Sequence, residues 1–107
     1  MKLAVGKVIL VPSFDVAIAD HVMYSAKRDT DITFIQLNNE SKTSVIVNLF
    51  IEFIEERVRI LPLDKVIDPN GMILFENLKY SLMADEKLLV TADKDFVVTY
   101  IVNGDYT

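Results

Sequence analysis

The fold is decided by one stretch of the sequence: TDITFIQL at Thr30–Leu37, NNESK at Asn38–Lys42 and SVIVNLFIEFI at Ser44–Ile54. In the last part every odd position from Val45 to Phe53 is apolar, whereas the even positions mix polar and apolar residues. A period of two places side chains alternately on the two faces of a strand. Asparagine and serine favour a turn between the two parts, because they tolerate left-handed backbone and bond back to it. The stretch therefore predicts two long strands joined by a hairpin loop.

Further strands are predicted on both sides of this stretch. Asp68–Gly71 (DPNG) is the clearest turn signal, since proline presets φ and Asn-Gly accepts left-handed backbone. The other predicted strands are residues 2–11, 58–60, 72–75, 87–92 and 96–102, the last of them closed by Asn103-Gly104. Residues 13–28 stay unassigned, and residues 78–83 fit either a loop crossing or one helical turn.

Short strands at regular spacing, with turn signals between them, indicate an all-β fold. We expect an antiparallel β-sandwich, Ig-like or jelly-roll-like, with about seven or eight strands. An amphipathic helix over residues 49–61 is the alternative, because Phe50, Phe53 and Ile54 begin a pattern with helical spacing. The β-branched residues of this region and Pro62 favour strands instead.

Composition restricts the chemistry that the chain can perform. Its 107 residues are 51% hydrophobic and include no cysteine and one histidine, His21. Without cysteine, disulfides, thiolate metal sites, iron–sulfur clusters and a cysteine nucleophile are excluded. The length is typical of one domain with its own core.

Negative charge is concentrated in the second half of the chain. Acidic and basic residues balance over residues 1–50, so the net charge of −5 lies in residues 51–107. Such a surface repels phosphate backbones, and Lys27-Arg28 is the only adjacent basic pair, so we expect no nucleic-acid partner. We expect no secretory signal, because Gly6 and Lys7 interrupt the N-terminal apolar stretch and Pro12 ends it. We also expect no membrane partner, because Asn48 and Glu52 interrupt the longest apolar stretch.

Candidate catalytic and metal-binding groups are few. Asp20, His21 and Ser25 offer the residue types of a nucleophilic triad, but no strained nucleophile turn accompanies them. Two pairs of aspartates, Asp29/Asp31 and Asp93/Asp95, could bind calcium, but neither lies in the pattern of a calcium loop. The adjacent carboxylates Glu55-Glu56 would point to opposite faces of a strand and so would not act together. We therefore expect no catalytic residue, metal or cofactor, and a protein that is not an enzyme. A small enzyme that uses His21 is the alternative.

Four segments together follow the pattern of one class of small domains. They are ITFIQLNN (Ile32–Asn39), TSVIVNLFIEF (Thr43–Phe53), IDPNGMILFENLKYSL (Ile67–Leu82) and ADEKLLVTADKDFVVTYIVNG (Ala84–Gly104). From about Tyr24 to Gly104 the chain resembles β-sandwich domains of bacteriophage virions, of the capsid-decoration or neck and tail accessory type. The Gly-Asp step of that pattern is Ala84-Asp85 here, so the glycine that would permit a left-handed turn is missing.

The resemblance implies a non-enzymatic structural protein located in the virion. We expect a capsid decoration protein that binds the major capsid or tail protein and forms a homo-oligomer. Residues 24–107 would form the sandwich, and residues 1–23 either its first strand or an arm that docks onto a neighbour. The apolar residues expected at protein interfaces come from the N-terminal segment and from the mixed face of the long strand: Leu3, Val5, Val8, Leu10, Phe14, Ile46, Phe50 and Ile54.

Two alternatives accompany this expectation. Ile46, Phe50 and Ile54 would pack against the opposite sheet if they belong to the core. A neck, tail or fibre accessory protein, or a sandwich that binds carbohydrate or a host surface, would be the alternative function. The aromatic platforms for carbohydrate would be tyrosines: Tyr24, Tyr80, Tyr100 and Tyr106.

Overall fold

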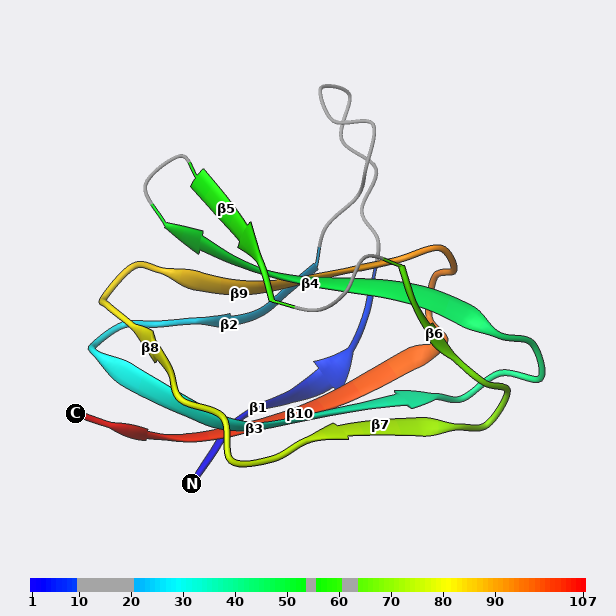
Figure 1. Ribbon diagram of the computed structural model, residues 1–107, viewed down its shortest axis with the longest axis horizontal. Helices are drawn as coiled ribbons and strands as arrows, with labels where there is room; N and C mark the ends of the chain where they lie inside the picture. Colours follow the sequence, from blue (N-terminus) through cyan, green and yellow to red (C-terminus); the bar gives the residue numbers. More distant parts are fainter. Residues whose placement is uncertain (10–20, 54–55, 61–63) are drawn as a thin grey trace.

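Ten strands account for the regular structure of the residues that the structure, a computed structural model, describes: 1–9, 21–53, 56–60 and 64–107 (Figure 1). The strands are β1 (Lys2–Lys7), β2 (His21–Ser25), β3 (Thr30–Asn39), β4 (Val45–Phe53), β5 (Glu56–Arg59), β6 (Lys65–Ile67), β7 (Met72–Phe75), β8 (Tyr80–Leu82), β9 (Lys87–Ala92) and β10 (Val98–Tyr106). These residues include no helix, and hence none long and apolar enough to cross a membrane.

The strands form two antiparallel sheets, which lie one above the other in Figure 1. The first sheet has the order β1-β10-β3-β7, with β8 also on β3, and the second has β2-β9-β4-β5, with β6 also on β4. Register shows that β7 and β8 share one edge of β3, and that β5 and β6 share one edge of β4. Each of these pairs is therefore one interrupted edge strand.

Counted in this way, the strand order of the two sheets is that of an eight-stranded jelly roll. The prediction of an all-β antiparallel sandwich is confirmed. Of the two topologies left open by the sequence, the strand order is the jelly-roll-like one. The chain passes from one sheet to the other after β1, β2, β3, β6, β8 and β9, as it does in a jelly roll.

The predicted hairpin between residues 30–37 and 44–54 is wrong. Both strands are present, but β3 lies in the first sheet and β4 in the second, so the loop between them bridges the sheets. The buried Asn39 holds this bridge. Its side-chain nitrogen donates to the carbonyl oxygen of Thr43 at 2.8 Å and to that of Ile67 at 3.1 Å, and its oxygen accepts from the backbone nitrogen of Ser41 at 3.0 Å.

The helical alternative for residues 49–61 is also excluded where the structure describes them. Phe50 to Phe53 pair across β4 and β5 with residues Arg59 to Glu56. Residues 78–83, which fitted a loop or a helical turn, contain the short strand β8. β10 does not end at Asn103-Gly104, as predicted, but runs on to Tyr106.

Left-handed backbone closes several of the turns without glycine. Asn70 has a φ of 55° in the predicted DPNG turn, where the backbone nitrogen of Gly71 donates to the carbonyl oxygen of Asp68 at 2.8 Å. At the Ala84-Asp85 step the left-handed residue is Asp85, with a φ of 75°. Aspartate and asparagine adopt this conformation more readily than most residues, so the missing glycine is replaced by its neighbour.

The core lies between the sheets and includes residues from the N-terminal strand. Leu37 on β3 and Val47 on β4 are fully buried, as is Val8, which directly follows β1. β1 pairs with β10, so residues Lys2–Lys7 form the first strand of the same sandwich, which was one of the two alternatives for this segment. Residues 10–20 of the predicted arm lie outside the described residues.

Candidate functional site

The predicted interface residues do not gather on one surface. Val5 is 57% exposed on the outside of the first sheet, while Ile46 is 36% exposed on the outside of the second. Val8 is fully buried, so it belongs to the core and not to an exposed interface. Leu3 is partly buried against that core. Leu10, Phe14 and Ile54 lie outside the described residues.

Ile46 and Phe50 lie on the outer face of the second sheet. Their odd-numbered neighbours Val45, Val47 and Leu49 are fully buried between the sheets. Because side chains alternate along a strand, the even positions must point outward. The two residues therefore do not pack against the opposite sheet.

An apolar row crosses this outer face over three strands. Register places Val22 on β2 beside Leu89 on β9, and Leu89 beside Phe50 on β4. Leu89 is only 2% exposed although it is not part of the core cluster. The guanidinium of Arg57 lies 5.9 Å from the Phe50 ring and 3.3 Å from the carboxylate of Glu52. Ile46 pairs with the half-exposed Val66, which adds a second apolar spot bordered by polar groups.

The outer face of the first sheet carries a second row of side chains, apolar except for Gln36. Val5, Ile101, Gln36 and Leu74 lie side by side on β1, β10, β3 and β7. Of this row, only Val5 is among the interface residues that the sequence predicts. The sequence does not predict Leu74, because all four residues of β7 are apolar and their alternation gives no signal of which pair faces outward.

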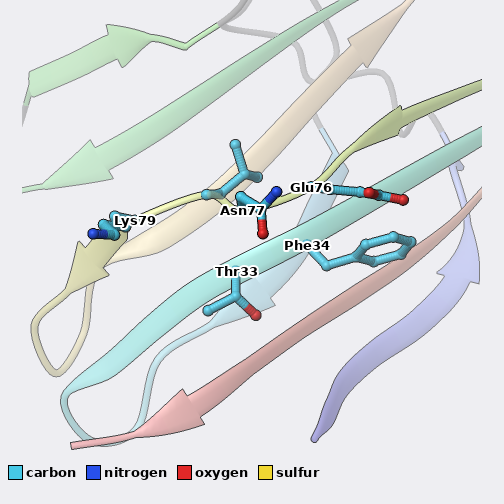
Figure 2. A pocket seen from close by; sticks show the side chains of 6 residues that line it. Thr33, Phe34, Glu76, Asn77 and Lys79 are labelled. Carbon is cyan, nitrogen blue, oxygen red and sulfur yellow. The ribbon is translucent and has the colours of Figure 1, made fainter.

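A hollow of about 530 Å³ lies beside β3, at the interruption between β7 and β8 (Figure 2). The chain leaves the sheet edge after β7, and Asn77 there has a φ of 57°. The backbone nitrogen of Leu78 donates to the carbonyl oxygen of Thr33 at 3.0 Å, which fixes the crossing against β3. The hollow is lined by Thr33, Phe34, Glu76, Asn77, Leu78 and Lys79.

The single histidine is a link between the sheets. Nε2 of His21 lies 2.8 Å from the hydroxyl of Tyr100, whereas Ser25 lies four residues farther along β2. A strand rises about 3.3 Å per residue, so Ser25 is roughly 13 Å away and does not form the triad. Tyr100 is buried, which removes it from the candidate carbohydrate platforms.

The aspartates of the Asp-x-Asp pairs hold neighbouring segments together. Oδ1 of Asp29 accepts from the backbone nitrogen of Ala84, Oδ1 of Asp31 from the Ser81 hydroxyl, and Oδ1 of Asp93 from the backbone nitrogen of Ile46. Glu56 is exposed at the start of β5, and Glu55 lies outside the described residues. Within the described part of the chain, no three His, Asp or Glu side chains are grouped as metal ligands.

Comparisons with protein-family models, curated proteins and solved structures find no match to this chain. The jelly-roll topology and its two outer faces are therefore the basis for a functional proposal.

Proposed function

We propose that the protein is a non-enzymatic structural subunit of a bacteriophage virion, which decorates the capsid by binding the major capsid protein. The observation that supports this most directly is a jelly roll with exposed apolar side chains on both outer faces. Jelly rolls are common building blocks of viral capsids. The solvated faces of antiparallel sheets are commonly polar, so neighbouring exposed apolar side chains on the outer faces fit a protein that is covered in an assembly.

The outer face of the second sheet is the proposed contact with the capsid. Ile46 and Val66 form an exposed apolar pair there, and Val22 lies on the same face. Glu52 and Arg57 border this surface with an ion pair. An apolar centre with a charged border is the usual composition of a protein interface.

The experiment uses purified particles of the phage that encodes the chain. Mass spectrometry is expected to find the protein in hundreds of copies per particle, and its absence from particles would overturn the proposal. A ring of about six or twelve copies would point instead to the neck or tail.

The surface itself is tested by adding purified protein to particles that lack it. The Ile46→Asp variant is expected to lose binding while remaining folded. Val58→Asp is the matched control, because Val58 is a half-exposed valine of the same sheet that pairs with the inward-facing Ile51. Equal binding by the two variants would exclude this face.

A second candidate, carbohydrate binding, is favoured by the hollow beside β3. Phe34 offers a partly exposed ring, and Glu76, Asn77 and Lys79 surround the hollow with polar groups (Figure 2). An aromatic surface with convergent polar groups suits a sugar. A glycan array is expected to give a signal that Phe34→Ala removes, and an array without signal counts against this function.

A further inference from the structure

We infer that the outer face of the first sheet binds the same face of a second copy of this chain, around a two-fold axis that runs parallel to the strands. In this dimer β1 of each copy lies over β7 of the other. The inference goes beyond the proposed function, because it concerns the face of the sandwich opposite to the proposed capsid contact.

Register defines the pattern of outward side chains on this face. The middle row is Val5, Ile101, Gln36 and Leu74, the row on one side of it is Lys7, Thr99, Asn38 and Met72, and the row on the other side is Lys2, Asn103 and Phe34. Glu76 directly follows β7 and lines the same hollow as Phe34, so it continues this last row (Figure 2). The face therefore has apolar side chains at both edges, Val5 on β1 and Met72 with Leu74 on β7, all of them 44% exposed or more.

The polar side chains at the centre of the face already bind one another. The amide nitrogen of Gln36 donates to the Asn38 oxygen at 3.1 Å, and the amide nitrogen of Asn38 donates to the Thr99 hydroxyl at 3.2 Å. That hydroxyl donates in turn to the Glu40 carboxylate at 3.1 Å. Polar groups with partners lose less free energy when they are buried, so these bonds lower the cost of covering the centre with a second copy.

Charge selects the orientation of the two copies. A two-fold contact joins the same patch on both subunits, and an axis parallel to the strands places β1 over β7 at equal height. Val5 then meets Leu74 of the second copy, and Lys2 meets Glu76 of the second copy, each contact occurring twice. An axis perpendicular to the strands would place Lys7 over Lys2 of the second copy, and like charges facing each other are unfavourable.

The size of the face sets the expected affinity. The strands of this face, β1, β10, β3 and β7, have six, nine, ten and four residues, and at about 3.3 Å per residue and 4.8 Å per strand they cover roughly 450 Å². Stable interfaces bury about 800 Å² per partner, so this dimer belongs with the small, transient interfaces. We expect it to dissociate at micromolar concentration.

The test is a charge exchange followed by sedimentation velocity over a concentration series. Lys2→Glu and Glu76→Lys are each expected to raise the dissociation constant about tenfold, because each places two pairs of like charges in the interface. The double variant restores opposite charges and is expected to return the dissociation constant close to the wild-type value. A wild-type protein that stays monomeric throughout the series, or a double variant as weak as the single ones, would overturn the inference.

An apolar contact gives an independent arm of the same experiment. Val5→Asp is expected to abolish the dimer, and Val58→Asp, which changes a similarly exposed valine in the other sheet, is expected to keep it. Circular dichroism shows whether each variant is folded. A folded Val5→Asp protein that dimerises like the wild type would contradict the proposed face.

Discussion

The hydroxyl of Tyr100 lies 2.8 Å from Nε2 of His21, and this contact joins β10 of the first sheet to β2 of the second. Nδ1 of the same imidazole lies 3.3 Å from the backbone nitrogen of Ile9. Gly6 on β1 makes room for the phenol, because a Cβ at that position would lie 2.6 Å from the Tyr100 hydroxyl. Three strands thus meet around one polar pair at the side of the sandwich where β1 and β2 form the sheet edges.

This arrangement predicts a loss of stability in alkaline solution. Burial raises the pKa of Tyr100, because the charged phenolate is poorly solvated there. In the unfolded chain the pKa of tyrosine is about 10. The neutral phenol of Tyr100 therefore contributes fully to the free energy of unfolding below that pH, and this contribution is lost as the pH rises through the higher pKa of the folded state. The free energy of unfolding, measured with urea, should therefore fall above about pH 10.

Substitution of the tyrosine separates this effect from the hydrogen bond. Tyr100→Phe should unfold about 1 kcal/mol more easily at neutral pH, because the bond to His21 is lost, and its stability should fall less steeply in alkali. Tyr106→Phe is the control, since Tyr106 is 47% exposed near the C-terminus and should leave the slope unchanged. An alkaline slope that survives in Tyr100→Phe would show that another group is responsible.

Asn39 is predicted to contribute far more to stability than its neighbour Asn38. Asn39 is buried, and its side chain binds the backbone of Ser41 and Thr43 in the bridge between β3 and β4. It also binds the carbonyl oxygen of Ile67 at the end of β6. Its replacement by alanine removes the partner of the buried Ile67 carbonyl, at about 1–3 kcal/mol, together with several part-buried bonds, so a total loss of roughly 3 kcal/mol is expected. Asn38 faces outward, and Asn38→Ala should change the free energy of unfolding by less than about 1 kcal/mol. Chemical denaturation of the two variants side by side tests this; equal losses would contradict the role assigned to Asn39.

Gly104 is predicted to be indispensable for the pairing of β10 with β3. A shift of register occurs between Asn103 and Gly104, and a Cβ at Gly104 would overlap the backbone carbonyl of Asp31. Backbone has little freedom to move away, so Gly104→Ala should destabilise the protein by roughly 3 kcal/mol, at the upper end of the range for overpacking. Thr99→Ala, on the outward side of the same strand, is the control for thermal unfolding. A Gly104→Ala protein with an unchanged melting temperature would contradict the close approach.

These residues show where sequence reasoning succeeds and where it ends. The alternation of Val45 to Phe53 predicts a strand with one buried face, because a period of two is a property of the segment itself. The same pattern does not reveal which strand lies beside it, so β3 and β4 were expected to pair with each other and instead lie in different sheets. Asn103-Gly104 predicts the end of a strand, because glycine is a turn signal when only the local sequence is considered. The strand continues because Gly104 pairs with Ile32 on β3, which lies some seventy residues away in the chain.

The candidate surfaces were predictable only in part. Ile46 and Phe50 were found from the sequence because polar residues mark their face of β4, whereas Leu74 and Met72 were missed in the uniformly apolar β7. The hollow beside β3 could not be predicted, because it arises where an edge strand is interrupted, and the interruption is visible only from the pairing of β7 and β8 with β3.

The N-terminal strand provides the last prediction. An arm that only docks onto a neighbour could be removed without unfolding the domain, but β1 pairs with β10 and Val8 is fully buried in the core. Removal of residues 1–8 leaves the edge of β10 unpaired and opens a cavity at the position of Val8, and loss of one buried valine alone costs about 2 kcal/mol. We therefore expect the truncated chain to show no cooperative thermal transition by circular dichroism. Removal of Met1 alone is the control, because it keeps β1 intact; a truncated protein that melts like this control would mean that residues 1–8 form a separable arm.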